Sequence, residues 1–553
     1  MTRVEDICTR DRGPEKGRLG SSFWANAKVP SSWVWWLPPA TLALTLALIF
    51  RDPFAGDWDA LDYTVLGVLG QPSSMVLGRT LFIFFNHSLW YAAHNAFALT
   101  PENAYLLFKY VVILQSPFAI IAWWRLSHGL TNSLRAATVS ALLLVLSPFF
   151  IIYSGQVMTE IPSLLFVAVA LTIHLSGLHT QRFIMVVFGA ALLGVSVNVR
   201  EAPLLYFPWL IVGPYSCGWR WNRNEIKTTI IACFAFSACA FGPFLFLFAT
   251  NFGSFRFAWL DWLHATQTES SRHPINVGNF GTLIGSFFAA APLVFLVFPL
   301  ALLKELKTRG LTPVAALAVV GFVANFMLIF HYGAVVNGRY VLTGLPAVIP
   351  LVADYLVVSV QRLIANPRLA FACVIMGVIL ISLIASRYAW PFNRAYVENR
   401  SLAKDYRNQL AKVPHDAIMI SGAQTVAVTY WRGLGMGDWN VISTGSTWPG
   451  AALNSVVARH LAGGNRVFLD ADPRWWLRDT WHRQELLDLA SLESGFRFRR
   501  VSGTIYEIRP HDDGTANDFP DLILQLRQQE PNMKGGLAAQ LLIPRQTMEL
   551  FIR

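Results

Sequence analysis

Long apolar segments alternate with short polar ones along residues 33–389 of the chain. A helix needs about 20 mostly apolar residues to cross the hydrocarbon core of a bilayer. Eleven segments approach this length, at residues 33–50, 103–124, 136–153, 161–178, 183–199, 202–217, 228–250, 280–303, 311–330, 340–360 and 369–388. The pattern therefore predicts a polytopic α-helical membrane protein with about 11 transmembrane helices in residues 33–389.

The loops between these segments alternate in charge. The N-terminal segment, residues 1–32, is basic, and so are the loops at residues 125–135, 179–182, 218–227, 304–310 and 361–368. Lys and Arg are retained in cytoplasmic loops, and eleven spans place all of these loops on the side of the N-terminus. We therefore expect a cytoplasmic N-terminus and an outer C-terminus, in the inner (plasma) membrane of a bacterium.

Residues 80–99 are apolar enough to form a twelfth span. A crossing there would move every later basic loop to the outside, so the charge pattern argues against it. The polar residues of the segment share one face of a helix. We therefore expect an amphipathic helix at the outer interface, within an outer loop at residues 51–102.

Beyond residue 389 the pattern changes to short apolar runs of strand type, interspersed with amphipathic helical segments. The runs lie at residues 417–421, 441–443, 466–470 and 496–509, and the helical segments at 453–461 and 480–492. This alternation predicts a C-terminal extracytoplasmic α/β domain over residues 390–510. Residues 511–553 form a polar tail.

Composition narrows the class of protein. The chain has 553 residues, of which 54% are hydrophobic and 14% charged, which is too apolar for a soluble protein of this length. Its net charge of +11 is spread over loops without a basic tract, so we expect no nucleic-acid partner. The five cysteines form no CxxC pair, which argues against a disulfide framework or a zinc site.

Four aspartates gather directly after the first span, within residues 51–63. They are Asp52, Asp57, Asp59 and Asp62. Acidic residues in an outer loop are usually only solvated, but such a cluster is unusual in a chain this poor in charge. Our hypothesis is that one of them, Asp59 first and Asp57 second, is a catalytic carboxylate on the outer face of a membrane enzyme.

The motifs around these residues resemble the GT-C superfamily of polyprenyl-phosphate-sugar-dependent glycosyltransferases, which includes protein O-mannosyltransferases and the aminoarabinose transferases of lipid A. Asp59-Ala-Leu-Asp-Tyr63 is similar to the Asp-Glu-x-x-Tyr motif of the first outer loop in that family, with Ala60 in place of the Glu. Further motif-like segments are Thr159-Glu160-Ile-Pro162, Arg200-Glu-Ala-Pro203 and Gly338-Arg339-Tyr340.

The resemblance implies roles for these residues. A carboxylate takes a proton from the acceptor during glycosyl transfer, which we assign to Asp59, with Asp57 as the second candidate. Arginines stabilise the phosphate leaving group, and Arg200 and Arg339 lie on the predicted outer side. The proposed substrate-binding residues are Glu160, Arg200, Arg339, Tyr63 and Tyr340. The sequence leaves open whether a divalent metal takes part, and this chemistry requires none.

The resulting functional prediction is an inverting glycosyltransferase that moves a sugar from a polyprenyl-phosphate donor in the membrane lipid to a glycan, lipid or protein acceptor on the outer side. One alternative is a transporter or flippase of lipid-linked sugars, although a transporter more often shows repeated halves and mid-span charges. Another is a non-enzymatic scaffold for envelope assembly, with the α/β domain as its binding module.

Overall fold

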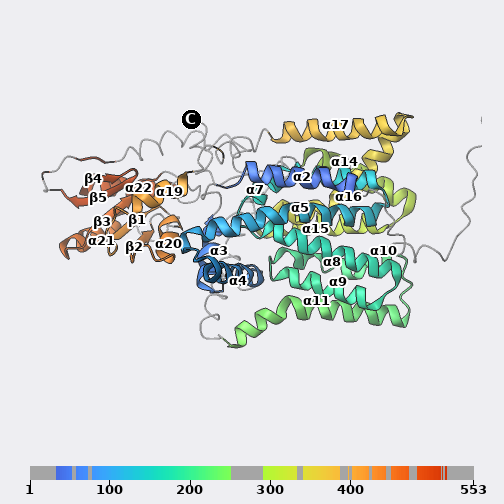
Figure 1. The fold of residues 1–553 in the computed structure, drawn as a ribbon, viewed down its shortest axis with the longest axis horizontal. Coiled ribbons are helices and arrows are strands. Elements are labelled where there is room, and N and C mark those ends of the chain that lie inside the picture. Colours follow the sequence, from blue (N-terminus) through green and yellow to red (C-terminus); the bar gives the residue numbers. More distant parts are fainter. Residues whose placement is uncertain are drawn as a thin grey trace, which may run out of the picture.

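The structure is a computed structural model that combines a bundle of long helices with a small α/β unit at one end (Figure 1). It describes residues 33–52, 58–72, 78–250, 291–332, 340–386, 397, 401–422, 426–443, 450–472, 482–511, 514 and 517–519. The predicted N-terminal segment 1–32 and almost all of the tail 511–553 lie outside the described residues.

The helical part contains the following elements. They are α2 (Trp33–Ile49), α3 (Trp58–Leu69), α4 (Thr80–Phe97), η1 (Pro101–Asn103), α5 (Ala104–Thr131), α6 (Leu134–Val145), α7 (Pro148–Ser154), α8 (Glu160–Thr180), α9 (Phe183–Val197), η2 (Ala202–Tyr206), α10 (Trp209–Ser216), α11 (Arg223–Thr250), α14 (Pro292–Arg309), α15 (Pro313–Tyr332), α16 (Val341–Leu363) and α17 (Pro367–Ser386). Each predicted span overlaps helical residues.

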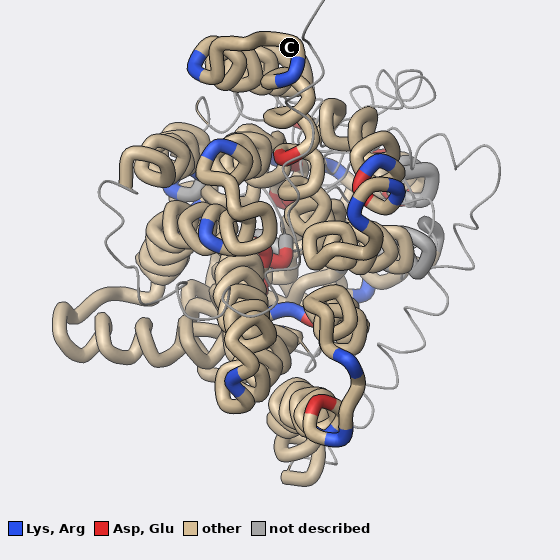
Figure 2. Tube along the Cα trace, turned by 90° about the vertical axis from the view of Figure 1, so that its right-hand side faces the viewer, with Lys and Arg blue, Asp and Glu red and all other residues tan. Residues whose placement is uncertain are grey.

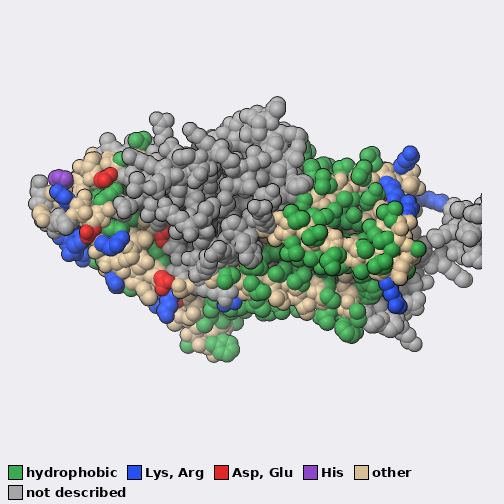
Figure 3. Space-filling model, turned by 90° about the horizontal axis from the view of Figure 1, so that it is seen from above, with side chains coloured by type: hydrophobic (Ala, Val, Ile, Leu, Met, Phe, Trp, Pro, Cys, Tyr) green, Lys and Arg blue, Asp and Glu red, His purple; other side chains and the backbone are tan. Residues whose placement is uncertain are grey.

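Five of the described helices are long and apolar enough to cross a membrane, and a sixth is reached if the bent pair α6 and α7 counts as one span. Shorter apolar helices lie at Trp33–Ile49, Phe183–Val197 and Pro313–Met327. On the face drawn in Figure 3, apolar side chains cover much of this part, and Lys and Arg gather at its end away from the α/β unit. The molecule is therefore an integral membrane protein with several spans, and the count of about 11 stays a prediction.

Prolines explain where the helices depart from the predicted spans. The segment predicted at 136–153 bends by 67° between α6 and α7, where Pro148 begins the second helix. Proline lacks the N–H that would continue the ladder, and its ring collides with the preceding turn. The segment predicted at 202–217 contains Pro203, Pro208 and Pro214, and it divides into the 3-10 helix η2 and the short helix α10.

Small residues let the long helices approach closely. A methyl group on Gly344 of α16 would collide with the carbonyl oxygen of Gly321 in α15. The side-chain oxygen of Asn325 accepts a hydrogen bond from the Gly344 N–H at 2.8 Å across the same contact. Between helices in a membrane, close backbone approach and buried polar contacts replace the hydrophobic effect as the source of association.

The C-terminal residues fold around a five-stranded sheet with the strand order β2-β1-β3-β5-β4. Its elements are α19 (Leu402–Leu410), β1 (Ile418–Ser421), α20 (Val426–Gly433), β2 (Asn440–Ser443), α21 (Gly450–Ala462), β3 (Val467–Asp470), α22 (His482–Gly495), β4 (Phe496–Ser502) and β5 (Ile505–Pro510). β1 pairs in parallel with β2 and β3, whereas β5 pairs antiparallel with β3 and β4.

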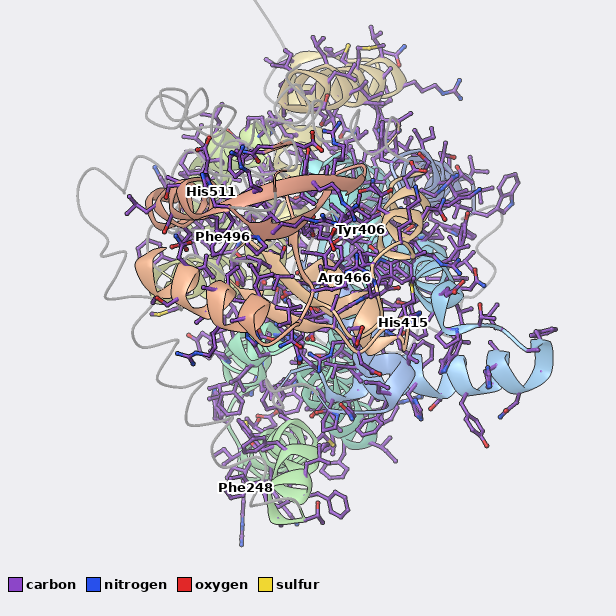
Figure 4. The ribbon with its side chains drawn as sticks, turned by 90° about the vertical axis from the view of Figure 1, so that its left-hand side faces the viewer. Phe248, Tyr406, His415, Arg466, Phe496 and His511 are labelled. Carbon is purple, nitrogen blue, oxygen red and sulfur yellow. The ribbon has the colours of Figure 1, made fainter. Side chains whose placement is uncertain are left out.

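Polar contacts tie the elements of the α/β unit together. Figure 4 looks onto this unit, with Tyr406 of α19 and Arg466 beside β3 labelled. The Tyr406 hydroxyl donates to the Asp470 carboxylate at 2.5 Å, and Arg466 pairs with Glu507 of β5 at 2.7 Å. The first of these contacts fastens α19 to the end of β3, and the second joins β3 to β5.

The α/β unit packs against one end of the helical part. Helix α20 lies against α3, where Gly433 faces Val65 at close range (Figure 1). Nearby, Arg407 pairs with Glu102, which precedes α5. The α/β unit therefore contacts α3 and the segment that precedes α5.

Candidate active site

A buried arginine, Arg79, joins three segments at the α/β end of the helical part. It lies just before α4 and is 5% exposed. Its Nε–H donates to the Tyr63 hydroxyl of α3, and its Nη1–H and Nη2–H donate to the Glu201 carboxylate, the second at 3.5 Å. Burial alone would lower the pKa of Arg79, but the charges of Glu201, Tyr63 and Asp59 outweigh it and hold that pKa well above its usual value.

The backbone conformation before Arg79 brings it against Glu201. Gly78 has a φ of +96°, which favours glycine, and a Cβ there would lie 2.5 Å from the Glu201 backbone nitrogen. Burial raises the pKa of Glu201, but Arg79 and Arg200 more than reverse this, so the pKa is lowered overall. The carboxylate therefore stays ionised at neutral pH, although it is largely enclosed by protein.

A second buried ion pair lies next to the first in sequence. Arg200 contacts Glu160, the first residue of α8, at 3.4 Å, and their side chains are only 4% and 1% exposed. The Arg200 guanidinium also lies 5.9 Å from the centre of the Tyr340 ring, which is the geometry of a cation–π contact. The structure therefore brings together three residues that the motifs had singled out separately.

Backbone hydrogen bonds fix these loops to one another. The Asp52 N–H donates to the Gly155 carbonyl at 2.9 Å, and the Leu81 N–H donates to the Asn198 carbonyl at 2.9 Å. Asp52 itself is fully buried, and its carboxylate accepts a hydrogen bond from Tyr105. Asp52 is therefore a structural residue that joins the end of α2 to α5.

Two of the predicted aspartates lie one turn apart on α3. Asp59 is 6% exposed and lies close enough to Arg79 for the two charges to interact. Asp62 as a whole residue is exposed to solvent, but protein atoms surround its carboxyl group and partly desolvate it. This desolvation, followed by the charge of Asp59 and partly offset by Arg79, raises the pKa of Asp62 to about 6. A carboxylate with such a pKa can accept and release protons near neutral pH.

The remaining predicted residues fall into two groups. Tyr63 is buried on α3 and accepts from Arg79, and its ring meets Phe82 edge-on at 5.7 Å. Asp57 and Arg339 lie outside the described residues. Their proposed roles therefore stay predictions.

Sequence reasoning missed Arg79 altogether and assigned no role to Glu201. Arg79 stands outside the motif-like segments, so it carried no signal of its own. Glu201 stands inside the segment Arg200-Glu-Ala-Pro203, and that adjacency to a singled-out arginine is the one signal that could have drawn attention to it.

A metal site is not built from the part of the chain that the structure describes. Within it, no group of three or more His, Cys, Asp or Glu side chains is arranged to hold a metal ion. The candidate site therefore consists of carboxylates, arginines and tyrosines, which can exchange protons and bind anions.

No protein-family model matches the sequence, and a search of curated proteins finds no match. Solved structures do resemble it. The apo oligosaccharyltransferase of Archaeoglobus fulgidus aligns with a TM-score of 0.54 at 13% identity, covering 89% of this chain and 76% of that one. ArnT from Cupriavidus metallidurans, bound to undecaprenyl phosphate, aligns with a TM-score of 0.50 at 13% identity, covering 86% of this chain and 97% of that one.

Both proteins are GT-C glycosyltransferases, and the alignments span the helical part and reach into the C-terminal part. The chain has a GT-C fold. The resemblance predicted from the motifs is thereby confirmed at the level of the fold. Within this GT-C fold, the described residues of the four motif-like segments lie on α3, at the start of α8, at the loop before η2 and directly before α16.

Proposed function

We propose that the protein is an inverting glycosyltransferase that moves a sugar from a polyprenyl-phosphate donor to an acceptor at the outer membrane face. The observation that carries this proposal is the pairing of Asp59 and Asp62 on α3 beside the buried arginine Arg79. It is supported by the GT-C fold and by the structural likeness to ArnT, which was solved with undecaprenyl phosphate. Carboxylates to accept a proton and arginines to stabilise a phosphate are the groups this reaction needs.

In this proposal Asp59 is the general base. Its carboxylate takes the proton from the acceptor hydroxyl or amine while that group attacks the anomeric carbon of the donor sugar. Asp62, which is exposed and has a pKa of about 6, then passes the proton to water. The two residues lie three positions apart on one helix, which places them on neighbouring turns of the same face.

The leaving group in this reaction is a polyprenyl phosphate, which carries its own negative charge. It needs cations rather than an acid, and we assign this role to Arg200 and Arg339. Arg79 is engaged by Glu201 and Tyr63. We therefore propose it as a positioning residue that holds α3, and with it Asp59, against the loop before η2.

The proposal is tested by sugar transfer from a labelled polyprenyl-phosphate sugar, followed by thin-layer analysis. Asp59→Asn keeps the shape of the side chain and removes its basicity, so transfer should slow by at least about 10²-fold. Asp405→Asn is a matched control, because Asp405 is an exposed carboxylate on α19, away from the candidate site. Undiminished transfer by a folded Asp59→Asn protein would move the base to Asp57 or Asp62.

The same pair of variants separates the enzyme from a flippase of lipid-linked sugars. A flippase moves the donor across the bilayer without consuming it, so its activity should survive the loss of a general base. If vesicles containing the protein translocate the donor but release no polyprenyl phosphate with any acceptor supplied, the glycosyltransferase assignment is wrong.

A further inference from the structure

A cavity of about 130 Å³ lies between α14 and α16, far from the candidate active site. A single ordered water needs only about 10–15 Å³ measured in this way, so the cavity has room for a larger polar group. Its lining includes the side chains of Lys304, Glu305, Arg309, Asp354, Tyr355 and Arg362. Three basic residues and two acidic ones therefore line one partly open space.

One of the two carboxylates at this cavity is already engaged. The Glu305 carboxylate accepts a hydrogen bond from the Thr312 hydroxyl at 2.8 Å and pairs with Arg309 at 3.6 Å. It is only 8% exposed, so these contacts hold it in place. Glu305 thus compensates Arg309 and fixes the turn between α14 and α15, rather than facing an incoming ligand.

Lys304 and Arg362 form no ion pair within 4 Å among the residues that the structure describes. The Lys304 ammonium instead lies 4.7 Å from the centre of the Tyr355 ring, which holds it at the cavity wall. Two cations therefore line one space. Of the two carboxylates in that lining, Glu305 forms an ion pair within the described chain and Asp354 does not.

The position of the cavity indicates where its ligand would come from. Helix α16 begins next to Tyr340, and Arg362 lies 22 positions further, or about 33 Å along the helix axis. The cavity is therefore at the opposite end of the membrane part from the candidate active site. Figure 2 views the molecule from that end and shows Lys and Arg around the helix termini. Basic pockets between membrane helices at the cytoplasmic surface are suited to phosphate-bearing headgroups.

We propose that this cavity binds a phosphate anion, contacted by Lys304 and Arg362, at the predicted cytoplasmic end of the helices. Such a phosphate is carried either by the headgroup of an anionic phospholipid or by free inorganic phosphate. The arginine can offer two parallel N–H donors to the phosphate oxygens, and the lysine supplies a point charge. Asp354 opposes the ligand and limits its affinity.

The test uses the purified full-length protein in neutral detergent, with native mass spectrometry of bound phosphatidylglycerol and phosphatidylcholine as the zwitterionic control. Lys304→Ala and Arg362→Ala should each weaken phosphatidylglycerol binding by about tenfold or more, because a charge-assisted contact is lost. Lys307→Ala is the matched control: it removes the same charge from an exposed position on the same helix, and binding should not change. Asp354→Asn should tighten binding.

A parallel arm measures thermal stabilisation by inorganic phosphate, with chloride at equal ionic strength as the reference. If the variants weaken phosphate stabilisation but leave phosphatidylglycerol binding intact, the ligand is free phosphate rather than lipid. Val358→Phe narrows the cavity without changing a charge and should weaken the binding of the same ligand. The test therefore does not depend on the folding of the charge variants alone. If Lys304→Ala, Arg362→Ala and Val358→Phe all bind both ligands as the unaltered protein does, the proposal is wrong.

Discussion

Arg79 pairs with Glu201 across 122 positions of sequence, and this contact connects the loop before α4 to the loop that follows α9. Both side chains are largely removed from water, at 6% and 17% exposure. Removing one partner of such a pair leaves an uncompensated charge, which is more costly than removing both. The pair therefore holds two loops of the candidate active site together.

The first prediction follows from this difference in cost between removing one partner of the pair and removing both. Arg79→Ala should lower the free energy of unfolding by about 3–5 kcal/mol, since Glu201 would keep its charge and lose the cation that it contacts. The double variant Arg79→Met, Glu201→Gln should recover much of that loss, because no buried charge is left. Thermal unfolding of the purified variants in detergent measures both, and equal losses in the single and double variants would show that the pair is not coupled.

The second prediction concerns the pH dependence of transfer. Asp62 must be ionised to receive a proton from Asp59, and its pKa is raised to about 6. The transfer rate should therefore fall as the pH drops through about 6. In Asp62→Asn this fall of the transfer rate at low pH should disappear. At neutral pH the transfer rate should be reduced less by Asp62→Asn than by Asp59→Asn. A fall at the same pH in Asp62→Asn would assign it to a different group.

The same pKa has a consequence for stability. An unfolded chain would lose the Asp62 proton near pH 3.8, whereas the folded protein keeps it up to about pH 6. Folded protein thus binds more protons between these values, and this residue makes stability fall as the pH rises across that interval. Unfolding measured from pH 4 to pH 7 should show a shallower decline in Asp62→Asn than in the unaltered protein.

Much of the helical architecture could be read from the sequence, since each apolar segment overlaps helical residues of the described chain. The approximate length of a span is set by bilayer thickness, so a count of apolar residues captures it. The predictions that failed concern the positions at which individual helices bend or end. Pro148 and the prolines from Pro203 to Pro214 broke or shortened two of the predicted spans, and their effect depends on how neighbouring helices satisfy the freed carbonyl groups.

The candidate site was only partly readable, for a similar reason. Short motifs singled out Asp59, Glu160 and Arg200, because each sits next to the end of an apolar segment. Which of them touch depends on how the loops pack, and Arg79 shows this most clearly. Its partners come from α3 and from the loop before η2, so nothing near it in sequence marks it as a buried residue.

A further prediction separates structure from chemistry at Arg200. Arg200→Ala should reduce donor use by about 10²–10³-fold if the arginine stabilises the leaving phosphate. It also leaves Glu160 buried without its cation, so a loss of stability is expected as well. Arg200→Lys should restore only part of the activity, because lysine lacks the planar fork of donors.

Glu160→Gln supplies the control for that experiment. It removes the charge that Arg200 compensates and leaves the guanidinium in place, so donor use should fall less than in Arg200→Ala if Arg200 binds the phosphate. Activities are compared per amount of folded protein, measured by size-exclusion chromatography. Normal turnover of the donor by folded Arg200→Ala protein would make Arg200 a structural residue.

The last prediction concerns the side of the membrane on which the site lies. Loop charges predict a cytoplasmic N-terminus, with tags at Asn132 and Gly310 also cytoplasmic and a C-terminal tag outside. The structure adds a constraint that loop charges alone do not supply. Helix α20 packs on α3, and Arg407 pairs with Glu102, so the α/β unit and the Asp59 region share one side of the bilayer. Accessibility labelling of single cysteines at Asp405 and Lys307 in intact cells should therefore modify only the first. Labelling of Lys307→Cys instead would reverse the topology, and it would move the proposed chemistry to the cytoplasmic face together with the α/β unit.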